Sequence, residues 1–272
     1  METIRSNGSN AGLPLAKRNL ADAAKRDTRM SARLPAALDP ETVLRAYASG
    51  IFPMADSARA NDVFWVEPRR RGVLPLREFH LPRSLAKLLR SERFILTADK
   101  AFDAVLAGCA EAVPDRKDTW INPLIANAYR DLHRLGHAHS IEAWTQDGEL
   151  AGGLYGVRLG GAFFGESMFT RQRDASKCAL AALAARLRVG GFTLLDTQFL
   201  TDHLARFGAR EVTARTYRAQ LASALGISAD FFAFDAFGVS PTPLPPLPTL
   251  PASTVSGPVS GNRIVQLLTQ IS

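Results

Sequence analysis

The chain has 272 residues, 46% of them hydrophobic and 22% charged, a composition typical of soluble globular proteins with about two structural units. No run of about 18 apolar residues occurs, which excludes a transmembrane helix, and the N-terminus lacks the apolar core of a secretory signal. Lys and Arg number 33 against 26 Asp and Glu, a net charge of +7 that favours an anionic partner, nucleic acid first. Two cysteines are too few for a disulfide framework, so a reducing compartment is expected.

Both ends of the chain look unlike its middle. Residues 1–35 carry seven Lys or Arg against three acidic residues, and we expect a disordered basic tail there. Seven of the sixteen prolines follow residue 240, which predicts a proline-rich C-terminal tail over residues 239–272. That tail is a linker or a docking strip for an aromatic groove, and a short apolar helical segment at residues 264–268 closes it.

The first folded elements predict a small N-terminal domain over residues 36–72. Asp39 is placed to cap a helix, Pro40 occupies its first turn, and Gly50 ends it. A short strand is expected at residues 63–66. The apolar loop at residues 50–54 either lines a pocket or only joins the helix to the strand.

The second half has a clearer pattern of apolar and turn residues, which predicts a domain over residues 73–238. Strands are expected at residues 140–144, 150–159, 162–169 and 193–198, and helices at residues 174–189, 203–207 and 213–225. Three consecutive strands, a helix, a strand and a helix favour an α+β fold with a mixed sheet flanked by helices.

Two strands carry polar side chains in apolar surroundings. Strict alternation puts Phe164, Glu166 and Met168 on one face and Phe163 on the other, unless Gly165 marks a bulge. Burying an unpartnered carboxylate is costly, so Glu166 faces a cation, a cavity or water, and a structural ion pair is the plainer alternative. Asp196 and Gln198 also share a face at a strand end, where they could orient an amine and a carbonyl together or cap the following helix.

Two further patterns concern metal and phosphate. His137 and His139 lack a third ligand at a useful spacing, so we expect no metal and assign His139 to anchoring its strand through hydrogen bonds. A basic stretch follows residue 68, and its members form either a solvated face or a phosphate track. They are Arg69, Arg70, Arg71, Arg77, Arg83, Lys87, Arg90 and Arg93.

These motifs together resemble one known family. In chain order they are residues 47–53 (YASGIFP), 119–121 (TWI), 129–133 (YRDLH), 135–142 (LGHAHSIE), 152–156 (GGLYG), 164–169 (FGESMF), 175–177 (ASK), 196–198 (DTQ) and 202–203 (DH). The set closely resembles the leucyl/phenylalanyl-tRNA–protein transferases over about residues 35–225, and both tails lie outside the match.

The resemblance implies a fold and an activity. The fold is a small N-terminal domain followed by an acetyltransferase-like (GNAT) domain. The activity moves Leu or Phe, and less well Met, from aminoacyl-tRNA to the N-terminal amine of proteins that begin with Arg or Lys, which marks them for degradation by the N-end rule. Such enzymes are bacterial and cytoplasmic, and we expect a monomer without a cofactor.

The resemblance also implies roles for individual residues. Asp196 would hold the amine and assist proton loss, Gln198 would orient the ester carbonyl, and Glu166 would bind polar groups of the donor or the acceptor's cation. The aminoacyl pocket would consist of Phe163, Met168, Leu154, Leu183, Leu187 and Leu195. The adenosine site would consist of Trp120, Tyr129, Tyr47 and Met54, where Met54 replaces a tryptophan of well-known relatives. Arg83, Lys87 and Arg90 would bind tRNA.

Two other function classes remain as alternatives. An acyl-CoA-dependent acetyltransferase could share the fold, but the segment before the long helix, residues 171–176, contains no glycine to cradle a pyrophosphate. A non-catalytic RNA-binding module would leave Glu166, Asp196 and Gln198 without a purpose.

Overall fold

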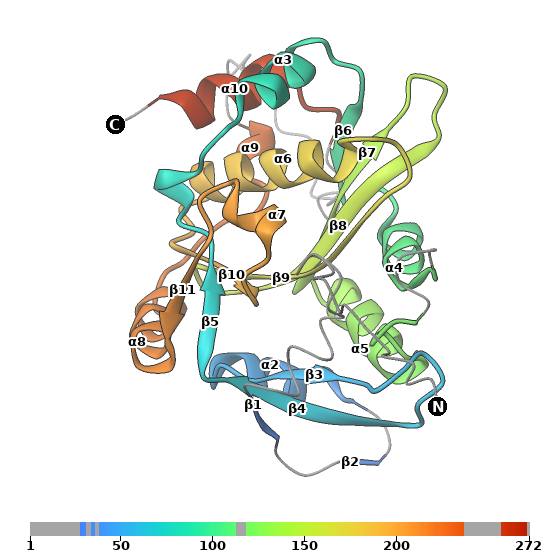
Figure 1. Cartoon of the computed structure of the whole chain (residues 1–272), viewed down its shortest axis with the longest axis vertical. Coiled ribbons are helices and arrows are strands. Elements are labelled where there is room, and N and C mark those ends of the chain that lie inside the picture. The colour runs from blue at the N-terminus through green and yellow to red at the C-terminus, as the bar shows by residue number, and fades with distance from the viewer. Residues whose placement is uncertain (1–27, 31–33, 36–37, 113–117, 237–256, 271–272) are drawn as a thin grey trace, which may run out of the picture.

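The computed structural model describes residues 28–30, 34–35, 38–112, 118–236 and 257–270. A seven-stranded sheet carries helices on both faces, and a four-stranded sheet of N-terminal residues lies at one end of it (Figure 1). The predicted α+β class with a mixed sheet is confirmed. Most of the predicted basic tail, and the proline run at residues 241–251, lie outside the described residues.

The small sheet is organised around β4 (Asp62–Pro68). Its antiparallel partners are β1 (Thr28–Met30), β2 (Leu34–Pro35) and β3 (Phe52–Met54). The backbone amide of Thr42 donates to Asp39 Oδ1 at 2.9 Å, so Asp39 caps α2 (Pro40–Ala48) as predicted. Two strands, β1 and β2, fall inside the segment that the sequence assigned to a disordered tail, because pairing with β4 fixes them.

The large sheet contains one parallel pair. In spatial order its strands are β11 (Arg210–Thr213), β5 (Arg70–Val73), β10 (Leu194–Gln198), β9 (Ala162–Thr170), β8 (Leu150–Leu159), β7 (Ala138–Trp144) and β6 (Ile95–Ala98). Only β9 and β10 run parallel, and every other neighbouring pair is antiparallel. Since β5 belongs to this sheet, the small N-terminal unit ends before Arg70.

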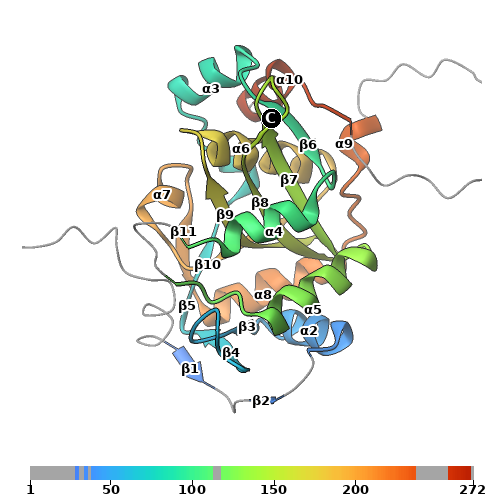
Figure 2. The same cartoon turned by 90° about the vertical axis from the view of Figure 1, so that its right-hand side faces the viewer.

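Helices cover both faces of the large sheet (Figure 2). One hydrophobic cluster contains side chains of α3 (Arg83–Arg90), α6 (Ala175–Val189), α9 (Ala233–Ala236) and α10 (Gly261–Thr269). The other contains side chains of α2, α4 (Phe102–Ala110), α5 (Pro123–Arg134) and α8 (Ala214–Leu225). The short helices η2 (Leu76–Glu78) and α7 (Asp202–Ala205) complete the described elements. None of the described helices is long and apolar enough to cross a membrane.

The end of the chain differs from the sequence prediction. Helix α10 buries Ile264, Val265 and Leu268 in the first cluster. The predicted helical segment therefore exists, but it belongs to the hydrophobic core, whereas the sequence placed it in a proline-rich tail. A proline run does not determine whether an amphipathic helix that follows it packs against the hydrophobic core.

A bulge in β9 determines where Glu166 points. Tyr155 of β8 pairs with Ser167 and the next residue, Gly156, pairs with Gly165, so Glu166 is the extra residue. Glu166 reaches toward α5, whereas Met168 packs against the cluster on the α6 face. The prediction from strict alternation, that both side chains share a face, is therefore wrong, and the alternative of a bulge near Gly165 is correct.

The bulge provides a stability prediction. A Cβ atom at Gly156 would lie 2.3 Å from the carbonyl oxygen of Phe164 and 2.4 Å from the Phe163 ring, whereas at Gly226 the nearest atom would be 3.7 Å away. Gly156→Ala should therefore lower the free energy of unfolding by about 1–3 kcal/mol relative to Gly226→Ala, because neither neighbour can move freely in a packed core. Urea unfolding measures the difference, and equal midpoints for the two variants would contradict the bulge geometry.

Candidate active site

Glu166 is held by a chain of tyrosine hydroxyls. The Tyr129 hydroxyl, from α5, donates to Glu166 Oε2 at 2.8 Å, and the Tyr47 hydroxyl, from α2, lies 2.7 Å from that of Tyr129. Both tyrosine side chains are fully buried, and Glu166 is 7% exposed. A helix of the small N-terminal unit thus helps to fix a carboxylate of the large sheet.

Gln198 reaches the same carboxylate from the neighbouring strand. Its Nε2 donates to Glu166 Oε1 at 3.0 Å, and its backbone amide donates to Asp196 Oδ1 at 2.8 Å. Gln198 has φ = 53°, a left-handed conformation that is unfavourable for a residue other than glycine, and the β10–β5 register shifts between Asp196 and Gln198. The irregular strand end therefore turns the amide toward Glu166.

Asp196 is the acceptor at the centre of a second buried group. Arg71 donates to both of its carboxylate oxygens, from Nε to Oδ1 at 2.9 Å and to Oδ2 at 3.0 Å, and from Nη2 to Oδ2 at 2.6 Å. The Tyr217 hydroxyl of α8 donates to Oδ2 at 2.6 Å. Arg71 Nη1 also donates to the carbonyl oxygen of Gly50 at 2.9 Å. Both charged side chains are at most 1% exposed, so this pair is shielded from solvent.

Arg71 and Tyr217 were not singled out as site residues by the sequence. Arg71 was assigned to a basic surface stretch, and the structure buries it instead. One signal was available, because a buried Asp196 requires a cation and Arg71 is the last member of an arginine run that enters a strand. Tyr217 carries no comparable signal, since an apolar helix face explains an aromatic residue equally well.

Burial changes the acidity of Glu166. Removal from water raises the pKa of this carboxyl to about 7, and the negative charge of Asp196 acts in the same direction. The hydroxyls of Tyr47 and Tyr129 and the charge of Arg71 oppose that rise. Near neutral pH, Glu166 is therefore able both to accept and to release a proton.

An apolar cavity opens where β9 and β10 separate. Their parallel pairing extends from Leu194–Ala162 to Asp196–Phe164, and the residues that follow in both strands line a cavity of about 420 Å³. Glu166 and Gln198 lie in its wall, and α7 contributes His203 and Leu204. A volume of this size is typical of small-molecule sites. The polar pair is therefore presented to an apolar hollow.

The predicted aminoacyl-pocket residues divide into two groups. Leu154, Met168 and Leu183 line the cavity. Phe163, Leu187 and Leu195 are instead buried in the hydrophobic core and do not line it. Leu180 and Phe169 line it and were missed. Spacing along α6 places several leucines on buried faces all round the helix, so sequence alone does not tell which ones reach the cavity.

The predicted adenosine residues also divide. Met54 and Trp120 line a small hollow of about 20 Å³ together with Phe52, Glu166, Gln198 and Phe199. The rings of Tyr47 and Tyr129 are completely buried. A buried ring offers no free face to a base, and the hydroxyls of both residues hold Glu166, so their place in an adenosine site stays a prediction.

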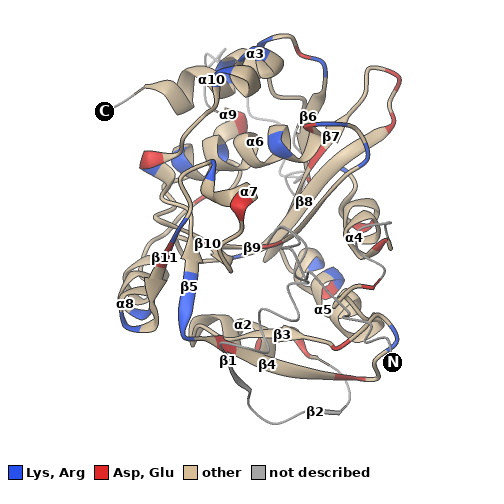
Figure 3. Cartoon of the chain, viewed as in Figure 1, with Lys and Arg blue, Asp and Glu red and all other residues tan. Residues whose placement is uncertain are grey.

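The basic residues of α3 are exposed. Arg83, Lys87 and Arg90 lie on its outer face, and Figure 3 shows Lys and Arg on α3 at one end of the molecule. They remain positions at which an anionic partner could bind.

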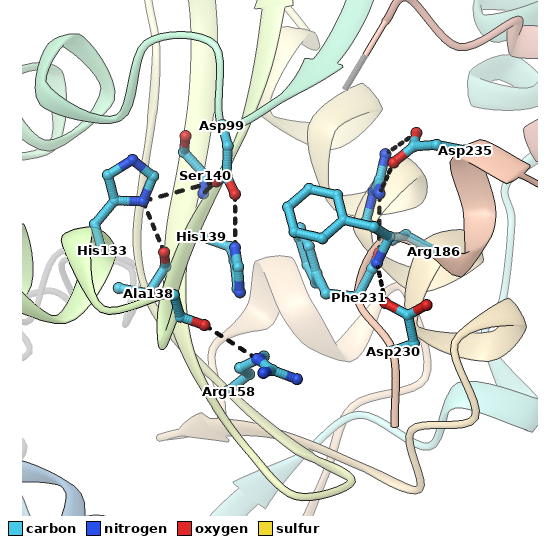
Figure 4. A network of polar contacts seen from close by, with 12 residues as sticks. Asp99, His133, Ala138, His139, Ser140, Arg158, Arg186, Asp230, Phe231 and Asp235 are labelled. Atoms are coloured by element: carbon cyan, nitrogen blue, oxygen red, sulfur yellow. Dashed lines mark hydrogen bonds and ion pairs between the residues drawn. The ribbon is translucent and has the colours of Figure 1, made fainter. Parts of the chain in front are cut away.

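Figure 4 shows a second polar network whose labelled residues do not line the cavity. His139 Nδ1 lies 2.6 Å from Asp99 Oδ2, and the backbone amide of Ser140 donates to Asp99 Oδ1 at 2.8 Å. These interactions join β7 to the end of β6, which confirms that His139 anchors its strand. Within the described ranges no group of three His, Cys, Asp or Glu side chains could hold a metal ion.

Comparison with known proteins identifies relatives over most of the chain. A family model described as leucyl/phenylalanyl-tRNA protein transferase matches residues 73–222, and the model of that family's N-terminal domain matches residues 36–69. A Rhizorhabdus wittichii protein named leucyl/phenylalanyl-tRNA–protein transferase is 56% identical over 256 residues, which cover 87% of this chain and 99% of the relative. A protein of the same name from Afipia carboxidovorans is 58% identical over 209 residues, covering 76% and 92%.

Among solved structures, L-PGS from Bacillus licheniformis aligns with a TM-score of 0.35 and 13% identity over 61% of this chain and 55% of that chain, a likeness too weak to carry an argument. The family models and the relatives establish the family of this chain, because their matches span both the small N-terminal unit and the large sheet. The chain therefore belongs to the leucyl/phenylalanyl-tRNA–protein transferase family and is an aminoacyltransferase.

Proposed function

We propose that the chain transfers Leu or Phe, and less well Met, from aminoacyl-tRNA to the N-terminal amine of proteins that begin with Arg or Lys. In this reaction the amine nitrogen bonds to the ester carbonyl carbon, the bond to the ribose oxygen breaks, and the freed hydroxyl takes the proton that the amine loses. The ester is already activated, so the step requires no ATP. Marking proteins for degradation by the N-end rule in the cytoplasm is the role that this activity would serve.

The observation that carries the proposal is the joining of Glu166 and Gln198 in one wall of an apolar cavity. Among the described residues, the hydrogen bonds of the Gln198 side chain end at Glu166, which leaves its second N–H and its carbonyl oxygen to face a substrate. That N–H would donate to the ester carbonyl, and the oxygen would accept from the amine. The Glu166 carboxylate would take the proton from the amine, assisted by its raised pKa, and pass it to the leaving ribose oxygen.

The part assigned to Asp196 changes. Its carboxylate oxygens accept hydrogen bonds from Arg71, Tyr217 and the backbone of Gln198, and it is fully buried. It does not line the cavity either, which favours a different part for Asp196. We propose that it is a positioning residue, which fixes the irregular backbone at Gln198 and so directs the amide.

The remaining parts of the donor can be placed around this pair. The side chain of Leu or Phe would occupy the cavity beside Leu154, Leu180 and Leu183. The hollow beside Trp120 and Met54 is too small for a nucleobase, and both side chains are buried. Adenine would therefore reach them only after these side chains moved apart, and Met54 would then give it a thioether contact. Phosphates of the acceptor stem would meet the exposed cations of α3.

We infer an acetyltransferase-like (GNAT) fold for the large sheet. Its support is the single parallel strand pair, β9 and β10, which separates to form the cavity. An acyl-CoA donor has less support, because the segment before α6 contains no glycine and Asp174 there places a carboxylate where a pyrophosphate would lie.

A direct assay tests the proposed reaction. Purified protein, leucyl-tRNA and a peptide beginning with Arg, without CoA, should yield the peptide extended by one Leu, because the ester supplies the free energy. A peptide that begins with Ala is the matched control and should react much more slowly. Mass spectrometry measures the product, and no extension of the Arg peptide would remove the proposal.

The raised pKa of Glu166 predicts two pH effects. Glu166→Gln should lower kcat/KM by about 100-fold and remove the inflection near pH 7, which leaves only that of the α-amine, whose pKa is about 7.7–8.0.

Folding also favours the protonated carboxyl, so the folded state binds more protons between pH 4.5 and about 7. The free energy of unfolding of the wild type should therefore decrease as the pH rises through that range. The Glu166→Gln variant should not show this decrease. Identical pH profiles for both proteins would contradict the role of Glu166.

A further inference from the structure

The chain continues beyond the family match with a packed segment that the proposed function does not use. We define the C-terminal extension as the described residues 227–236 and 257–270, which follow the last matched residue, 222. Arg186 of α6 donates to both carboxylate oxygens of Asp235 at 2.7 and 2.8 Å. The Phe231 ring stacks on His139 of β7 at 4.1 Å between centroids (Figure 4). The first part of the extension is thus fastened to the body of the protein.

The second part packs against α3. Helix α10 lies beside α3 in Figures 1 and 2, and α10 and α6 are the helices packed against it. Helix α3 has eight residues, and isolated helices shorter than about 12 residues are marginal in water. Its position therefore depends on the helices that cover its apolar face.

The start of α10 approaches the backbone at the end of α3. A Cβ atom on Gly261 would lie 1.9 Å from the carbonyl oxygen of Leu89, so only glycine allows this approach. Ser260 donates to Glu92 at 2.8 Å, and the amide of Val259 donates to the Leu96 carbonyl of β6 at 2.9 Å. Three adjacent residues of the extension thus fix the C-terminal end of α3 and the strand that follows.

The opposite face of α3 carries the residues proposed to bind tRNA. Leu85, Ala86 and Leu89 are buried, whereas Arg83, Lys87 and Arg90 are exposed. Interactions with phosphates set the register of a bound nucleic acid, so a helix that presents three cations must be held in a defined orientation relative to the cavity.

We propose that the C-terminal extension is a positioning element for tRNA: α10 holds α3 so that its cations meet the acceptor stem while the aminoacyl end enters the cavity. This inference rests on the proposed function of α3. The extension then affects the affinity for tRNA and not the transfer step. Near 0.15 M salt, an α3 cation that no longer reaches its phosphate should raise the KM for aminoacyl-tRNA by about fivefold.

A pair of glycine variants tests the inference in the full chain. Gly261→Ala pushes α10 away from α3, whereas Gly257→Ala adds the same methyl group where no atom lies within 4 Å. Each protein is assayed with leucyl-tRNA and with 3′-O-leucyl-adenosine, a donor too short to reach α3. We expect Gly261→Ala to raise the KM for leucyl-tRNA about fivefold with unchanged kcat and unchanged transfer from leucyl-adenosine, and Gly257→Ala to behave as the wild type.

The other outcomes are distinguishable. Equal KM values for leucyl-tRNA in both glycine variants would overturn the inference. An equal loss of kcat/KM with leucyl-tRNA and with leucyl-adenosine in Gly261→Ala would also overturn it, because that result indicates a purely structural role. Should Gly261→Ala not fold, Ser260→Ala, which removes the hydrogen bond to Glu92, takes its place with the same readout. An Arg83→Ala, Lys87→Ala, Arg90→Ala variant that leaves the KM for leucyl-tRNA and its salt slope unchanged would instead refute the proposed function of α3.

Discussion

The buried pair of Arg71 and Asp196 is the constraint on which the site depends. Removing two charges from water is expensive, and the cost is offset only when the remaining donors and acceptors are satisfied. Here the guanidinium also bonds the Gly50 carbonyl, and the carboxylate also accepts from Tyr217 and the Gln198 backbone. The pair therefore joins the loop after α2, the strands β5 and β10, and helix α8. Removing one partner would leave an unpaired charge in the interior.

The geometry of Glu166 and Gln198 follows from that constraint. The backbone at Gln198 adopts an unfavourable left-handed conformation, and its hydrogen bond to Asp196 holds it there. On the neighbouring strand a bulge turns Glu166 toward Gln198. Two irregular strand positions, side by side, produce both the polar pair and the separation of β9 from β10 that opens the cavity. Regular strands would have continued the ladder and closed that space.

Much of the second half could be predicted from the sequence because its signals are local. The strand predicted at residues 150–159 coincides with β8, and the helix predicted at residues 174–189 matches α6 to within one residue. Turn residues and helix-ending glycines sit at their boundaries. Residues 73–138 and the edge strand β11 have weaker periodicity, and most of their elements were not anticipated.

The sequence indicated which polar residues belong to the site, but not which of them contact each other. Glu166 and Gln198 were singled out because polar side chains interrupt apolar strands, and they do meet. Arg71 was assigned to the surface because its partner lies 125 residues away in sequence. Tyr47 and Tyr129 were assigned to an adenosine site, and their support of the Glu166 carboxylate was missed. Each error concerns long-range pairing or a bulge, which spacing along the chain does not encode.

The most direct test of this account replaces both charges of the buried pair. Asp196→Leu alone should lower the free energy of unfolding by about 3–5 kcal/mol, because Arg71 is left uncompensated, and the double variant Arg71→Met with Asp196→Leu should recover most of that loss. Turnover of the double variant, measured as Leu transfer to an Arg peptide, should nevertheless stay far below that of the wild type, because the Gln198 backbone no longer has its acceptor. A double variant that recovers both stability and turnover would show that the pair does not position Gln198.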